Sequence, residues 1–123
     1  MQPDDERDWK RRIEEILDAI DRIKSYTEGL DFEAFAANSL VTDAVSYRFI
    51  VIGEAANQVP AVIQSRAPMI PWRNMRDMRN VVAHNYRGLN LRVVWLTLTE
   101  NFGPLTVQLQ TFLNSDDTPS AAP

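Results

Sequence analysis

The sequence predicts an all-α protein, a bundle of four to five helices. Apolar residues recur at three- and four-residue spacing through most of the chain, no run alternates with a period of two, and the intervening stretches are short. The 123 residues suffice for one domain, which we place at residues 1–113. Residues 114–123 (NSDDTPSAAP) are small and polar, and we expect this tail to be disordered.

The first predicted helix is about twenty residues long. We expect Asp4 or Asp5 to cap its start and Gly29 to end it. Charged residues separate its apolar positions, which are Trp9, Ile13, Ile16, Leu17, Ile20 and Ile23. A short helix at residues 31–38 follows, with Phe32 and Phe35 as its apolar contacts.

The next helix belongs in the centre of the bundle. It is capped by Thr42 or Asp43 and runs through Gln58, and its middle, FIVIGEAA, is apolar almost all round. Gly53 indicates that another helix approaches closely. An unpaired carboxylate would be costly in this stretch, so we interpret Glu54 as the partner of an arginine in preference to a catalytic acid.

Two further helices complete the prediction. After a short turn at residues 60–66, a helix extends from Trp72 to residue 85 or 86, with Gly88 in the C-cap position. Asn90 caps the last helix, which Gly103–Pro104 should kink or split because proline has no N–H to donate. Its apolar positions are Leu91, Val94, Trp95, Leu98, Phe102, Leu105, Leu109 and Phe112.

Composition excludes several classes of function. The chain has no cysteine, which rules out disulfides and thiolate chemistry and fits a reducing compartment. A single histidine argues against a metal site, and without a P-loop, a GxGxxG motif or a GxSxG motif we expect no cofactor. No apolar run approaches the ~20 residues that span a bilayer, so we expect a cytoplasmic protein that makes no membrane contact.

Positive charge is concentrated in one part of an acidic chain. The net charge is −4, yet residues 66–99 carry +5, which leaves −9 on the rest. The arginines of this stretch are Arg66, Arg73, Arg76, Arg79, Arg87 and Arg92. A guanidinium is a planar fork of donors that suits phosphate. The stretch is therefore either a phosphate-binding surface or a basic face that balances acidic neighbours.

The segment RNVVAHNY, residues 79–86, holds the only histidine of the chain. Histidine has an unperturbed pKa of about 6.5 and can take and give a proton at neutral pH. Arginine can stabilise charge that develops on a phosphate. His84 and Arg79 thus have the chemistry for metal-free RNA cleavage, with His84 acting on the ribose 2′-hydroxyl or on the leaving oxygen. The alternative is that His84 is a helix cap or a surface residue.

Helical geometry separates these residues. At about 100° per residue, Arg79 and Tyr86 lie within about 20° of each other, whereas His84 lies about 140° from Arg79, on the side of Asn80 and Arg73. Three arrangements could bring Arg79 to His84: the helix deforms near Tyr86, the long Arg79 side chain reaches round, or a second copy of the chain completes the site.

RNVVAHNY fits the Rx4HxY motif of the HepT family, whose members are toxins built on the HEPN (higher eukaryotes and prokaryotes nucleotide-binding) domain. The surroundings are similar too: AVSYRFIVIGEAAN on the middle helix, and IPWRNMRDMRNVVAHNYRGLNLRVVW across the motif into the last helix. The likeness extends from about Trp9 to Leu113. The Gly103–Pro104 break and the acidic overall charge depart from the pattern outside the motif.

The resemblance implies a helical bundle that forms a two-fold homodimer, and a metal-independent endoribonuclease that cuts mRNA or tRNA. Arg79 and His84 match the family's catalytic pair, and Asn80 matches a polar residue that assists them. Tyr86 matches the tyrosine to which a cognate nucleotidyltransferase antitoxin of the MntA type attaches AMP, which would add negative charge beside the cleft. The arginines expected to bind RNA phosphates are Arg73, Arg76 and Arg87.

Related HEPN proteins suggest a second class of function, a non-catalytic helical subunit that binds a nucleotide or a nucleotidyltransferase partner. His84 would then be a contact residue and not a base. A third interpretation is a purely structural dimer in which Arg79 pairs internally with Glu54.

Overall fold

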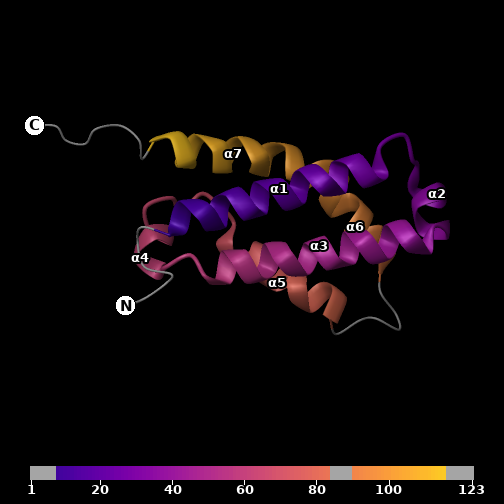
Figure 1. Cartoon of the computed structure of the whole chain (residues 1–123), viewed down its shortest axis with the longest axis horizontal. Coiled ribbons are helices and arrows are strands. Elements are labelled where there is room, and N and C mark those ends of the chain that lie inside the picture. The colour runs from indigo at the N-terminus through magenta and orange to yellow at the C-terminus, as the bar shows by residue number, and fades with distance from the viewer. Residues whose placement is uncertain (1–7, 84–89, 116–123) are drawn as a thin grey trace, which may run out of the picture.

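The computed structural model describes residues 8–83 and 90–115, and within these ranges it is all helical, which confirms the predicted fold class (Figure 1). Two short helices, α2 (Phe32–Ala37) and α4 (Ala61–Gln64), connect longer ones. The long elements are α1 (Trp9–Thr27), α3 (Ser39–Asn57), α5 (Trp72–Ala83) and a composite of α6 (Leu91–Leu96), a π-helical turn η1 (Thr97–Asn101) and α7 (Phe102–Ser115).

Helix α3 is the central element, as its apolar sequence predicts. It packs along α1 and along α5, and α2 lies against it near its start (Figure 1). The apolar side chains that face inward from these helices and from α4 and α7 are buried, and they form one continuous core. The largest of them are Phe35, Phe49, Ile13, Ile16, Ile23, Ile52, Ile63, Met75 and Leu109. One face of α3 remains exposed to solvent, so the helix is not covered on every side.

Two of the expected helix caps are wrong. Helix α3 begins four residues earlier than Asp43, because the side chain of Asn38 accepts a hydrogen bond from Val41 N at 3.1 Å. Thr42 lies inside the helix, where its hydroxyl donates to the carbonyl of Ser39. The residue at the N-cap of α1 is Asp8, in place of Asp4 or Asp5, and its side chain makes no capping hydrogen bond.

Other boundaries agree with the sequence. Gly29 follows α1 with φ of +81°, a left-handed conformation that side chains disfavour. Asp31 caps α2 by accepting from Ala34 N at 2.9 Å, and Asn90 caps α6 by accepting from Arg92 N and Val93 N. The expected end of the motif helix and Gly88 lie outside the described residues.

The predicted break at Gly103–Pro104 takes the form of the π-helical turn η1, which ends just before Phe102. Pro104 has no N–H for the carbonyl of Glu100, and its ring would crowd that carbonyl in a regular α-helix. The wider π turn relieves this conflict without splitting the helix. Helix α7 continues through Ser115, two residues beyond the expected boundary at residue 113, and the remainder of the predicted tail lies outside the described ranges.

Separate aromatic clusters close the two ends of the bundle. At one end the ring of Phe112 lies 4.7 Å from that of Trp9 and 6.3 Å from that of Trp72, so α7 is joined to the starts of α1 and α5. At the other end the ring of Trp95 lies 5.0 Å from that of Phe35, which joins α6 to α2. Ring pairs at these distances stabilise beyond their buried area.

Candidate functional site

The RNVVAHNY segment lies at the end of α5, and the structure describes only its first part. Arg79 and Asn80 are on α5, whose described end is Ala83. His84, Tyr86 and Arg87 lie outside the described residues, so their roles stay predictions. The geometry of the site is therefore that of α5 and of the helix it packs against.

Helix α5 touches α3 backbone to backbone at Gly53. A Cβ atom added to Gly53 would lie 2.9 Å from the Arg79 nitrogen, 3.0 Å from the Arg79 Cβ and 3.1 Å from the Arg76 carbonyl oxygen. No side chain fits between the helices at this point, which confirms the close approach that Gly53 predicts. Met75 and Met78 bury the inner face of α5 at the same crossing. The backbone of Arg79 is thus fixed by the core of the bundle.

The side chain of Arg79 is held by the residue that follows Gly53. Its Nη1 donates to Glu54 Oε2 at 2.9 Å, and the Arg79 and Glu54 side chains are 35% and 52% exposed. The interpretation of Glu54 as the partner of an arginine is confirmed. Because Glu54 faces solvent, the pair is a surface ion pair, which stabilises a fold by about 0–1 kcal/mol.

The other predicted site residues on α5 are separate from this pair. Arg73 and Asn80 are exposed, seven residues apart and hence on the same side of the helix two turns apart. Arg76 is half-buried, and its Nη1 donates to Gln64 Oε1 at 3.0 Å, which ties α5 to α4. Arg73 and Asn80 are therefore open to a ligand, whereas Arg76 has a structural contact.

A second group of cations, Arg22 and Arg48, lies between α1 and α3, and no motif in the sequence indicates it. A hydrogen bond from Arg48, and more weakly one from Arg22, lowers the pKa of Tyr26 below its usual value of 10.0. Arg22 also donates to Asp18 at 2.8 Å, and the Nε of Arg48 is buried without a hydrogen-bond partner. The one signal in the sequence is the spacing of Asp18, Arg22 and Tyr26 at four-residue intervals on one face of α1.

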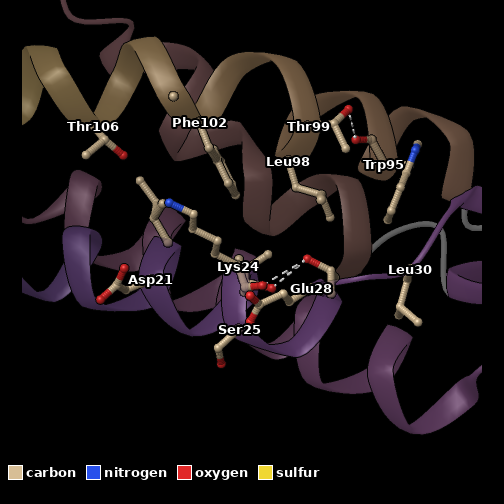
Figure 2. Close-up of a pocket in the computed structure, with 14 residues that line it drawn as sticks. Asp21, Lys24, Ser25, Glu28, Leu30, Trp95, Leu98, Thr99, Phe102 and Thr106 are labelled. Carbon is tan, nitrogen blue, oxygen red and sulfur yellow. Dashed lines mark hydrogen bonds between the residues drawn. The ribbon is translucent and has the colours of Figure 1, made fainter.

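A cavity of about 820 Å³ lies between α1 and the composite helix, and neither Arg79 nor Asn80 lines it (Figure 2). Its walls include the apolar side chains of Leu98 and Phe102. Its charged groups are Lys24 and two carboxylates, Asp21 and Glu28, so its lining is net negative and does not suit a phosphate. A second cavity of about 390 Å³ lies among α3, α5 and α7.

Within residues 8–83 and 90–115 no three or more His, Asp or Glu side chains cluster as metal ligands would. No helix in the same ranges combines the length and the apolar character needed to cross a bilayer.

Comparison with known proteins identifies the family. The model of the family described as "Ribonuclease HepT-like" matches residues 16–112. The chain belongs to the HepT-like ribonuclease family. The HepT-like match spans the helices that carry Gly53, Glu54 and Arg79, so these contacts are part of the family's domain.

Relatives of this HepT-like chain include "Probable ribonuclease HepT" of Thermococcus cleftensis, which is 35% identical over 80% of this chain and 90% of the relative. "Putative RNase MJ0125" of Methanocaldococcus jannaschii is 35% identical over 74% of this chain and 78% of the relative. No solved structure matches the chain. The prediction of an enzyme of the ribonuclease class is confirmed at the level of the family.

Proposed function

We propose that this HepT-like ribonuclease is a toxin, a metal-independent endoribonuclease whose catalytic pair is Arg79 and His84. The observation that supports it best is the state of Arg79: its backbone is fixed against α3, while its guanidinium is partly exposed at the surface of the motif helix. A fixed arginine at the surface is suited to holding a phosphate that must bear extra charge in the transition state.

In the proposed reaction the ribose 2′-oxygen attacks the adjacent phosphorus and the bond to the 5′-oxygen of the next nucleotide breaks. His84 takes the 2′-hydroxyl proton or gives a proton to the leaving 5′-oxygen, and Arg79 stabilises the negative charge on the phosphorane-like transition state. The products are a 2′,3′-cyclic phosphate and a free 5′-hydroxyl. Asn80, exposed on α5, assists the catalytic pair. Arg73, also exposed on α5, contributes positive charge that binds RNA phosphates, together with Arg76 and Arg87.

The test is cleavage of labelled tRNA and mRNA in EDTA by the purified protein, free of any antitoxin, beside His84→Ala. We expect the wild type to cut and the variant to be inactive. Equal cleavage by both would remove His84 from the mechanism. No cleavage by wild-type protein whose mass shows an unmodified Tyr86 would favour the non-catalytic subunit instead.

We also propose that a nucleotidyltransferase antitoxin of the MntA type silences the enzyme by attaching AMP to Tyr86. The phosphate would place negative charge next to arginines that otherwise bind RNA, and the two would compete. Co-expression with such an antitoxin should raise the mass of the wild-type protein by one AMP and leave Tyr86→Phe unchanged. A mass increase in Tyr86→Phe would assign the modification to another residue. Both partners would act in the cytoplasm, where the RNA substrate is found.

A homodimer is part of the same proposal. The exposed face of α3 carries large apolar side chains, of which Leu40 is 82% exposed and Tyr47 and Ile50 are also open to solvent. A group of large apolar side chains exposed on one helix face is typical of a surface that another molecule covers. A dilution series followed by light scattering should show dimers that dissociate and lose RNA cleavage together. Full activity in a demonstrated monomer would refute a site shared between two copies.

A further inference from the structure

The contact between Glu54 and Arg79 has a role that goes beyond pairing two charges, if Arg79 acts on RNA as proposed above. The two residues reach each other because Gly53 brings α5 against α3, and Glu54 is the next residue of α3. The carboxylate is therefore carried by the same rigid helix that fixes the Arg79 backbone. Two independent contacts, one to the backbone and one to the guanidinium, hold the residue from the same side.

Glu54 occupies only part of the hydrogen-bonding capacity of Arg79. A guanidinium has five N–H donors. One nitrogen, Nη1, donates to Glu54 Oε2, and among the described residues no second partner reaches the other donors. With 35% of the side chain exposed, these donors are accessible to a ligand. The carboxylate thus fixes one nitrogen of the fork and leaves the rest of it available.

We propose that Glu54 is a positioning residue for RNA cleavage, which orients the Arg79 guanidinium so that its remaining donors meet the phosphate. An arginine side chain without a partner samples many rotamers, and most of them would not meet the phosphate in the geometry of the transition state. The pair selects the orientation before RNA arrives. Glu54 itself does not touch the reacting atoms, since its charge would repel the phosphate.

This role has a kinetic signature. Loss of orientation lowers the rate of the chemical step, kcat. Loss of the negative charge of Glu54 leaves the site more positive, so RNA binds as well or better and KM does not rise. Removing the hydrogen-bond partners that orient metal ligands typically costs about 10- to 100-fold in affinity or activity, and a partner that orients a catalytic arginine should have an effect of similar size. We therefore expect Glu54→Ala to lower kcat by about 10- to 100-fold with an equal or lower KM.

Two conservative variants separate the effect of side-chain length at residue 54 from the effect of its charge. Glu54→Gln keeps the length of the side chain and an oxygen that can accept from Nη1, although a neutral acceptor holds a guanidinium less firmly. Glu54→Asp keeps the charge but withdraws it by about 1.5 Å, one carbon–carbon bond. If Glu54 orients Arg79, kcat should be highest in the wild type, lower in Glu54→Gln and lower still in Glu54→Asp, which should be close to Glu54→Ala. If charge alone mattered, Asp would retain activity and Gln would not.

The experiment measures kcat and KM on a short labelled RNA for the wild type and the three variants, with thermal melts of each protein. Asp18→Ala is the matched control, because it removes another exposed ion pair, Asp18–Arg22 at 2.8 Å, on α1. We expect its kcat to equal that of the wild type. All five proteins should melt within a few degrees of one another, because exposed pairs contribute little to stability.

The outcomes separate failure of the positioning role from failure of the ribonuclease proposal. If Glu54→Ala has the same kcat as the wild type, the positioning role is overturned and the ribonuclease proposal stands. The same holds if Glu54→Asp retains its kcat and Glu54→Gln does not. A higher KM at unchanged kcat would make Glu54 a binding residue and also overturns the positioning role. If the wild-type protein itself does not cut RNA, the proposed function fails, and the positioning role fails with it.

Discussion

The contact at Gly53 can be tested by adding a single methyl group. In Gly53→Ala the new Cβ would lie 2.9 Å from the Arg79 nitrogen, whereas ordinary contacts begin at 3.4 Å, so α5 must move away by about 0.5 Å. Overpacking of this kind costs about 1–3 kcal/mol. Alanine has a higher helix propensity than glycine, which offsets about 1 kcal/mol of this loss of stability. We expect a net loss of about 1 kcal/mol, which lowers Tm by about 4 °C.

The effect on activity should exceed the effect on stability. A displacement of about 1 Å can cost about 100-fold in rate, so a shift of half that size should lower RNA cleavage by about tenfold. Circular dichroism melts and single-turnover cleavage at a temperature well below Tm measure the two effects separately. At that temperature the variant is still folded, so slower cleavage reports on the position of α5.

Gly103→Ala is the matched control. A Cβ at Gly103 meets no atom within 4 Å, so this variant gains helix propensity without a clash. We expect it to be as active as the wild type and up to about 1 kcal/mol more stable. If Gly53→Ala behaves like Gly103→Ala, with higher stability and full activity, the backbone contact between α3 and α5 does not exist as described.

Three further predictions concern the rest of the fold. Gly29→Ala places a side chain at φ of +81° and should cost about 1–2 kcal/mol; an unchanged Tm would contradict the assigned turn. Since Arg48 lowers the pKa of Tyr26, an ultraviolet titration should show one tyrosine ionising below pH 10.0, and Arg48→Gln should raise that pKa toward the usual value. Between the pKa of Tyr26 in the folded protein and its higher pKa in the unfolded chain, the unfolded chain binds more protons, so the stability that this tyrosine contributes rises with pH. Identical titrations of the wild type and Arg48→Gln would disprove the contact. Phe35→Ala should cost about 3–5 kcal/mol because the side chain is fully buried, and more than Phe32→Ala, whose side chain is half-buried; equal losses would contradict the packing of α2.

Sequence periodicity predicted the helices, and Gly53 predicted the close approach of another helix to α3, which the structure identifies as α5. The inner face of each helix is apolar at regular spacing, and a glycine inside an apolar helix has few explanations besides close approach. Glu54, next to that glycine, could then be expected to meet a residue of the approaching helix. The sequence left the pairing of Glu54 with Arg79 as one alternative, and the structure shows it.

Other features depend on details that the sequence leaves open. Asn38, Thr42 and Asp43 are all good capping residues, and only packing against the core decides that α3 begins at Ser39. The contacts of Arg48 with Tyr26 depend on how α1 and α3 cross, which no spacing within one helix encodes. The position of His84 relative to Arg79 stays a prediction, because His84 lies outside the described residues.

The two aromatic clusters have a practical consequence, because each contains tryptophan. Trp9 and Trp72 lie beside Phe112 at one end of the bundle, and Trp95 lies beside Phe35 at the other. A protein that retains only Trp95 would report, through its fluorescence, on opening of the end where α2 and α6 meet. A protein that retains only Trp9 would report on the opposite end. Partial opening, if one end loosens before the other, would then be visible as two separate transitions in place of one.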